Sequence, residues 1–107
     1  MFARIVECEA KNGRTEELKD KVKNDVLSIL QKQPGFVDFL VLSDKNFEQR
    51  VVCISFWNSR DDADTYHQQH YDTITDLLRP ILQSAATLET FTVNASTAHR
   101  IAVARAA

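Results

Sequence analysis

The chain has 107 residues, of which 44% are hydrophobic and 26% charged, and its formal net charge is −2 at pH 7. This length suits a single domain over residues 1–107 with one hydrophobic core. The small net charge and the scattered lysines and arginines disfavour a nucleic-acid partner. No apolar run approaches the roughly 18 residues of a membrane span, and Arg4 and Glu7 interrupt any signal-peptide core, so we expect no membrane association.

The two cysteines, Cys8 and Cys53, stand singly inside apolar stretches and lack the CxxC spacing of a redox or zinc site. A free cysteine packs as a small hydrophobic residue. We therefore interpret both as buried thiols of a reduced, cytoplasmic protein. A redox pair would require that the two strands carrying them are neighbours.

The first half of the chain predicts a strand, a helix and a second strand. Residues 2–10 are β-branched in the middle and partly alternating, as in a strand. Thr15 is the expected N-cap of an amphipathic helix. Pro34 and Gly35 end that helix, and residues 36–42 follow as a nearly continuous apolar strand. The helix has apolar residues at steps of three and four, namely Leu18, Val22, Val26, Ile29 and Leu30.

The second half predicts a strand, a helix and a last strand. Residues 50–57 give the strongest strand pattern, with apolar side chains on both faces. Ser59 and Asp62 resemble a capping box at the start of a helix, and Pro80 should end or kink it near its last turn. Residues 87–93 alternate as the final strand. The stripe of the helix comprises Ala63, Tyr66, His70, Ile74, Leu77, Leu78 and Ile81.

The order strand, helix, strand, strand, helix, strand is that of the α+β ferredoxin-like fold, in which both helices cover one face of an antiparallel sheet. Residues 36–42 and 50–57 are apolar on both faces, so the second face needs a cover. The simplest cover is the same face of a second copy, which gives a homodimer. The alternative is that Asp38, Ser55 and Arg4 make this face polar enough to stand alone.

The core should span about residues 2–93, and residues 94–107 form a polar and then alanine-rich tail. Within it, residues 100–103 could add a short edge strand, and docking on the partner subunit is one expectation. His99 and Arg100 would belong to that solvated or partner-docking segment.

Three segments carry a family likeness: Pro34-Gly35-Phe36 before one strand, Phe56-Trp57-Asn58-Ser59 at the end of the next, and Tyr66-His67-Gln68-Gln69-His70-Tyr71 in the helix that follows. With the element order, residues 2–93 resemble the antibiotic biosynthesis monooxygenase domains of the dimeric α/β-barrel superfamily. The resemblance implies a homodimer with a cavity in each subunit between the sheet and the helices.

That family includes monooxygenases that oxidise aromatic polyketides or quinols without metal or flavin, haem-degrading members, and many members with no established activity. The haem-degrading pattern pairs an aromatic residue in the second helix with a histidine further along it. Here Tyr66 is followed by Asp76 where that histidine would lie, and the asparagine expected on the first strand has no match between Arg4 and Glu9. Haem breakdown is therefore disfavoured, and the resemblance implies no cofactor.

Residues 66–71 are the segment of the chain richest in side chains that could take part in a reaction. Tyr66 and His70 are four residues apart and share a helix face, as do His67 and Tyr71. In a cavity, His70 or His67 could accept a proton from a phenol, with Tyr66 as hydrogen-bond partner. The plainer alternative for His70 is a hydrogen bond to backbone or water. The two histidines lack an evident third ligand, so we expect no metal site.

An aromatic ligand would find its natural wall in Trp57, Phe56, Phe39 and Tyr71. The alternative for Trp57 is a core or interface anchor. Arg4 and Asp38 are polar residues in strands, which could line the interior or face solvent.

We therefore expect a homodimer that accepts a small, flat phenolic or quinol-type molecule and, as an enzyme, oxygenates it without a cofactor. The second hypothesis is a non-catalytic ligand-binding or interaction module of the same fold. An enclosed cavity lined by His70 and Tyr66 would favour an enzyme or a ligand-binding module. A cavity filled by phenylalanine and leucine side chains would favour the interaction module.

Overall fold

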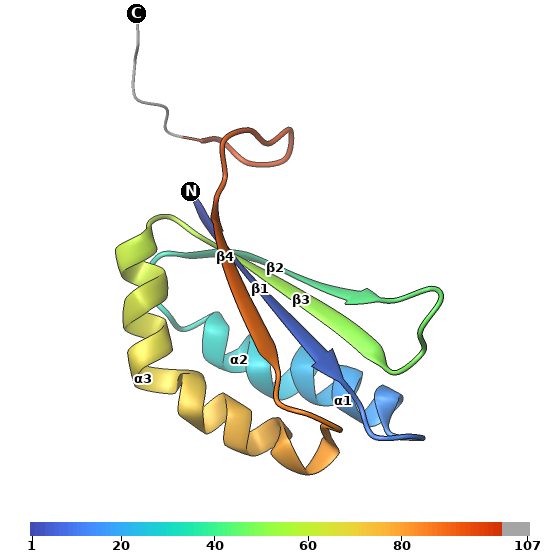
Figure 1. Ribbon diagram of the computed structural model, residues 1–107. Coiled ribbons are helices and arrows are strands. Elements are labelled where there is room, and N and C mark those ends of the chain that lie inside the picture. The colour runs from blue at the N-terminus through green and yellow to red at the C-terminus, as the bar shows by residue number, and fades with distance from the viewer. Residues whose placement is uncertain (102–107) are drawn as a thin grey trace, which may run out of the picture.

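The computed structural model describes residues 1–101, in which one antiparallel sheet carries all of the helices on one face and leaves the other face open (Figure 1). The strand order β2-β3-β1-β4 confirms the ferredoxin-like fold. In chain order the elements are β1 (Phe2–Glu9), α1 (Thr15–Lys21), the π-helical segment η1 (Val22–Val26), α2 (Leu27–Leu30), β2 (Phe36–Ser43), β3 (Arg50–Trp57), α3 (Arg60–Leu78), the 3-10 helix η2 (Arg79–Ile81) and β4 (Thr87–Thr92).

The register of the sheet decides which side chains face the helices. On β3, burial alternates residue by residue, and Val51, Cys53, Ser55 and Trp57 are the buried members that face the helices. Arg4 on β1 lies opposite Ser55, so it faces the helices too. A bulge between Phe36 and Asp38 on β2 then sets Phe39 opposite Ser55, on the same covered face.

The first helix runs from Thr15 to Leu30 as α1, η1 and α2 without a break. Its four inward residues, Leu18, Val22, Val26 and Leu30, are spaced by four and are all buried. An α-helix turns about 100° per residue, so each step of four drifts by about 40°. The π-helical turn in the middle winds more slowly and keeps all four on one face. The sequence pattern predicted the helix but not this turn.

The start of the first helix differs from the prediction. Arg14 occupies the N-cap position, and Thr15 is the first helical residue. Its Oγ1 is buried and has no hydrogen-bond partner among the described residues. The Arg14 side chain instead pairs with Glu17, with distances of 2.8 and 3.0 Å, in the first turn. At the other end of the helix, Gly35 has a φ of 80°, as the predicted left-handed cap requires.

The second helix, α3, begins as predicted. Ser59 is its N-cap, and the Ser59 Oγ accepts a hydrogen bond of 3.2 Å from the backbone N–H of Asp62. The Gly35 carbonyl accepts from the backbone N–H of Asn58 at 2.8 Å, which ties this helix start to the end of the first helix. Pro80 lies in η2, where the helix tightens and ends. The helix buries Ala63, Tyr66, Ile74 and Leu78 against the sheet.

The centre of the open face of the sheet is apolar, as the two-faced strands predict, and Glu7, Arg50 and Glu89 lie toward its margins. Leu40, Leu42 and Phe91 are 41%, 44% and 47% exposed, and the half-buried Ile54 lies between β1 and β2 on the same face. Neither Ser55 nor Arg4 makes this face polar, because both point to the helices. Of the three polar residues considered for it, only Asp38 lies on the open side.

The described part of the tail folds back on its own chain. The His99 ring lies 5.3 Å from the Phe56 ring, and its Nε2 lies 3.0 Å from Asp38 Oδ2. Residues 100 and 101 form no strand. The rest of the short edge strand expected over 100–103 falls outside the described residues.

Candidate functional site

A small cavity lies between the covered face of the sheet and the helices, where the resemblance implied one. Its volume is about 50 Å³, enough for about three or four waters. Its apolar wall includes Val22, Val26 and Leu30 from the first helix. The wall also holds aromatic rings, two thiols and one charged group, so the space is not filled by phenylalanine and leucine alone.

A larger groove adjoins this cavity on the outside. It measures about 460 Å³ and lies between α3 and residues 82–86, the segment that leads into β4. This volume is within the range of about 300–1,000 Å³ of small-molecule sites. Four residues, Tyr71, Thr75, Leu82 and Ala86, line both spaces and form the partition between them. A ligand larger than a few waters would have to displace part of this partition.

Arg4 is the one charged group in the described cavity wall. Its side chain is held inside the molecule and the residue is only 3% exposed. The guanidinium Cζ lies 5.3 Å from the centroid of the Tyr66 ring and 5.4 Å from that of Tyr71. Burial lowers the pKa of Arg4, and Tyr66 partly offsets this. An arginine nevertheless stays protonated at neutral pH.

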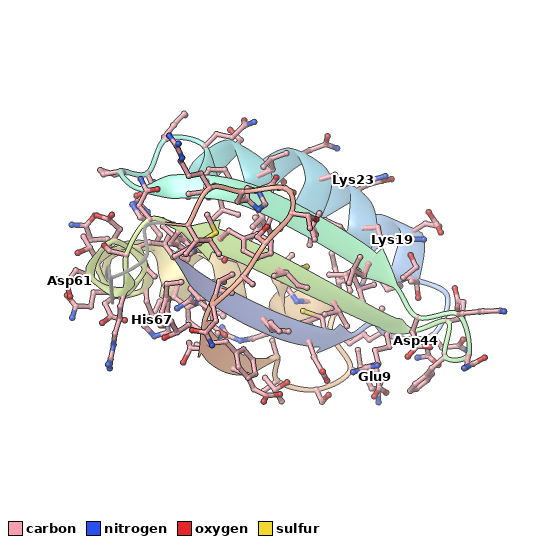
Figure 2. All side chains as sticks on the ribbon, turned by 90° about the horizontal axis from the view of Figure 1, so that it is seen from above. Glu9, Lys19, Lys23, Asp44, Asp61 and His67 are labelled. Carbon is pink, nitrogen blue, oxygen red and sulfur yellow. The ribbon has the colours of Figure 1, made fainter. Side chains whose placement is uncertain are left out.

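His67 is the hydrogen-bond acceptor for Arg4. The Arg4 Nη1 lies 3.2 Å from His67 Nδ1, and because a guanidinium only donates, Nδ1 must accept and the ring proton sits on Nε2. Burial, and then the charge of Arg4, lower the pKa of His67, so the ring is neutral at pH 7. His67 also stacks on Tyr71, with 4.4 Å between ring centroids. Figure 2 shows His67 at one end of the molecule and Asp44, in the β2–β3 hairpin, at the other.

The two histidines do not line the described cavity. His70 is half-buried, and its ring is 6.2 Å from that of Tyr66. Within residues 1–101 its side chain makes no hydrogen bond to protein. Its ring therefore does not reach the cavity in this structure, and a role as proton acceptor stays a prediction. His67 contacts the cavity wall from outside, through Arg4 and Tyr71.

The predicted aromatic wall is divided by the structure. Tyr66, Tyr71 and Phe39 line the cavity. Trp57 lies behind Tyr66, fully buried, with its ring stacked 4.9 Å from the Tyr66 ring. The Trp57 Nε1 donates a 2.9 Å hydrogen bond to Ser55 Oγ. Phe56 stands between Ser55 and Trp57 on β3, so its side chain points to the opposite, open face of the sheet. It is not part of this wall.

The polar and thiol side chains of the wall that were not among the predicted site residues include Arg4, Cys8, Cys53 and Ser55. The period-two alternation that buries Trp57 also points Ser55 and Cys53 to the helices, so the signal was present. Both cysteines are free and buried, as predicted. Their strands are neighbours, but Cys8 pairs with Val51 and Cys53 with Val6, so the thiols are diagonal to each other.

The acidic groups of the wall hold their protons at neutral pH. Burial raises the pKa of Cys8 to about 11 and that of Cys53 to about 12. Burial likewise raises the pKa of Tyr66 to about 12 and also raises that of Tyr71. In the wall as described, therefore, no side chain is a ready base at pH 7, and the only charge is positive.

Within residues 1–101, no three histidine, cysteine, aspartate or glutamate side chains converge as a metal site would require. None of the helices described is long and apolar enough to cross a membrane.

The family model for antibiotic biosynthesis monooxygenases matches residues 1–72, from β1 into the second half of α3. The chain belongs to the antibiotic biosynthesis monooxygenase family. The match ends at Asp72, before β4 and before most of the outer groove. No curated protein matches the chain in sequence.

Solved structures share the whole fold at low sequence identity. A protein from Nitrosomonas europaea, provisionally described as an antibiotic biosynthesis monooxygenase, is 21% identical, with a TM-score of 0.74 over 89% of this chain and 100% of its own. SnoaB, a cofactor-independent oxygenase from Streptomyces nogalater, is 19% identical, with a TM-score of 0.73 over 92% and 98%. MhuD, solved with two manganese protoporphyrin IX molecules per active site, is 20% identical, with a TM-score of 0.75 over 91% and 98%. These identities show the fold alone.

Proposed function

We propose that this protein is a cofactor-independent oxygenase of a small phenolic or quinol-type molecule, bound between the sheet and α3. One observation carries the proposal: an apolar cavity with the aromatic side chains Phe39, Tyr66 and Tyr71 in its wall ends at a single buried cation, Arg4. Aromatic walls suit a flat ring, and a positive charge stabilises the anion of a phenol. Membership of the family agrees with this chemistry.

The reaction needs no group beyond the substrate and O₂. A phenol that has lost its proton carries electron density on the ring carbon para to its oxygen. That carbon forms a bond to O₂, and the terminal oxygen takes up a proton. The carbon then loses its hydrogen as the O–O bond breaks, which leaves a quinone and releases water. One phenol and one O₂ thus give one quinone and one water, and the four electrons lost by the ring are gained by oxygen.

Ionisation of the substrate is the step in which the protein would help most. Because Cys8, Cys53 and Tyr66 keep their protons at pH 7, we assign this help to the charge of Arg4, which favours the phenolate, with the proton released to solvent. His67 fixes the guanidinium by accepting from Nη1. A proton acceptor role for His70 or His67 is the other arrangement, and Tyr66 is then its hydrogen-bond partner.

The second candidate is a non-catalytic module that binds a small ligand or another protein. The size of the inner cavity favours it, since 50 Å³ holds only a few waters until the partition with the outer groove moves. For either function we propose a homodimer through the open face of the sheet and a location in the cytoplasm.

Oxygen consumption tests the proposal. The purified protein would be incubated with a panel of phenols and hydroquinones, with O₂ uptake and quinone formation followed together. We expect uptake above buffer for at least one compound, with one quinone formed per O₂. His70→Ala tests one form of the second arrangement, because it lowers kcat only where His70 accepts the proton. Arg60→Gln, on the exposed side of α3, is the control. Uptake equal to buffer across the panel would favour the non-catalytic module.

A further inference from the structure

Arg4 is a buried cation with no carboxylate to neutralise it in the described part of the chain. Arg50 shows what a paired arginine looks like in the same sheet: it lies 2.7 Å from Glu7 and 3.0 Å from Asp44, near the surface. Arg4 is far more deeply buried and makes no such ion pair. An unpaired charge inside a protein is costly, and in most proteins it is paired or absent.

The contacts of Arg4 leave one edge of its guanidinium free. The rings of Tyr66 and Tyr71 pack against the group, and Nη1 donates to His67. The Nη2 atom is buried and has no hydrogen-bond partner within residues 1–101. A buried donor without an acceptor costs about as much as a lost hydrogen bond. Since Arg4 also lines the cavity, an acceptor bound there is the group that would satisfy it.

A partner subunit is poorly placed to supply this acceptor. Arg4 faces the helices, whereas the apolar face that we propose for dimerisation is the opposite face of the sheet. Of the carboxylates on α3, Asp64 influences Arg4 only at a distance, and it instead forms an ion pair with Arg60 at the surface. The missing partner of Arg4 is therefore sought in the cavity itself.

We propose that the cavity binds an aromatic anion, with a carboxylate or phenolate oxygen of the ligand accepting a hydrogen bond from Arg4 Nη2. A planar guanidinium binds such oxygens with charge-assisted hydrogen bonds, which are stronger than neutral ones. The ring of the ligand would extend past Tyr71 and Thr75 toward the outer groove. This inference rests on the proposed function for the place of the ligand, but it requires no reaction with O₂.

Three naphthalene derivatives of the same shape test the inference by calorimetry in the absence of turnover. They are 2-naphthoate, which is an anion at pH 7, 2-naphthamide, which is neutral, and 2-naphthol, measured at pH 7 and again at a pH where it ionises. We expect wild type to bind the naphthoate at least about tenfold more tightly than the naphthamide, the size of one charge-assisted hydrogen bond. A gain in naphthol affinity on ionisation identifies a phenolate site, and a preference for naphthoate alone identifies a carboxylate site.

Arg4→Gln should bring the ratio of naphthoate to naphthamide affinity close to one, and Arg60→Gln, at the surface, should keep the preference. Equal affinity of wild type for naphthoate and naphthamide together with no gain in naphthol affinity on ionisation, or binding of none of the three probes, overturns the inference without any variant. Should Arg4→Gln fail to fold, Arg4→Lys keeps the charge and should retain part of the preference; its complete retention of the tenfold ratio would contradict the Nη2 contact. A naphthoate preference without any O₂ uptake would overturn the oxygenase and leave the anion site standing.

Discussion

The guanidinium of Arg4 lies over the ring of Tyr66, with 5.3 Å between Cζ and the ring centroid, and Tyr66 in turn stacks on Trp57 at 4.9 Å. A buried cation thus stands at the end of a column of aromatic rings. Cation–π contacts contribute about 0.5–2 kcal/mol each, which is less than the several kcal/mol that it costs to bury a charge. On this comparison Arg4 weakens the fold, and its presence is better explained by a ligand.

The first prediction follows from that balance. Arg4→Met keeps the volume of the side chain and removes its charge, so the free energy of unfolding should rise by about 1–3 kcal/mol. Urea denaturation of wild type and variant measures it, and Arg60→Gln should stay within about 0.5 kcal/mol of wild type as a surface control. A loss of stability in Arg4→Met would make Arg4 a structural residue.

The hydrogen bond from Trp57 Nε1 to Ser55 Oγ gives the second prediction. Trp57 is fully buried, and the 2.9 Å bond is the partner that the structure gives to its indole N–H. Ser55→Ala leaves this donor unsatisfied, so we expect a loss of about 1–3 kcal/mol in the free energy of unfolding. Ser28→Ala, at an exposed position on α2, removes the same hydroxyl without that effect. Equal stability of the two variants would contradict the prediction.

Periodicity and capping residues were enough to predict the fold. The strand over residues 50–57 has the bounds of β3, because the alternation ends on both sides at polar or turn-forming residues. Thr15 was wrongly predicted as a cap because a threonine before a helix is recognisable in sequence, while the competing Arg14–Glu17 pair depends on side-chain geometry. The only sequence signal of the π-helical turn is weak: the inward residues from Leu18 to Leu30 are all spaced by four.

The site was predicted less completely. Helical spacing put Tyr66 and Tyr71 on the side of α3 that faces the cavity, but it also put His70 there, between Tyr66 and Ile74, and the half-buried ring of His70 does not line the cavity. Phe39 and Phe56 were interchangeable in sequence, and the bulge in β2 decides that Phe39 faces the cavity. A charged residue in a strand can face either side, so only the pairing of Arg4 with Ser55 showed that it is buried.

The third prediction concerns pH and His67. Burial and the charge of Arg4 lower the pKa of His67 in the folded state. As the pH falls, His67 therefore becomes protonated in the unfolded chain before it does in the folded protein. The contribution of His67 to stability is therefore complete above its unfolded pKa of about 6.5 and declines below it. Free energies of unfolding measured from pH 7.5 to 5 should fall for wild type and fall less for His67→Gln. The same slope in both proteins would show that His67 does not titrate in this way.

The fourth prediction is a dimer through the open face of the sheet. Three strands of eight residues and one of six, at about 3.3 Å per residue and about 4.8 Å between strands, give a face of about 480 Å² per subunit. Two such faces bury about 1,000 Å², near the lower limit of a stable interface. Its exposed apolar centre, with Leu40 and Leu42, would supply the driving force. A homodimer through this face is therefore expected.

Light scattering after size-exclusion chromatography measures this dimer and its sensitivity to charge. Leu40→Lys places a cation on the apolar face. This cation would have to lose its hydration water in the interface, so the variant should shift the protein to a monomer. Gln31→Lys adds the same charge at an exposed position beyond α2, on the helical layer, and should leave the dimer intact. A wild-type monomer at micromolar concentration, or an intact dimer in Leu40→Lys, would mean that the open face is covered in another way. The described tail, whose His99 already packs against Phe56 on this face, is then the nearest segment of the chain to examine.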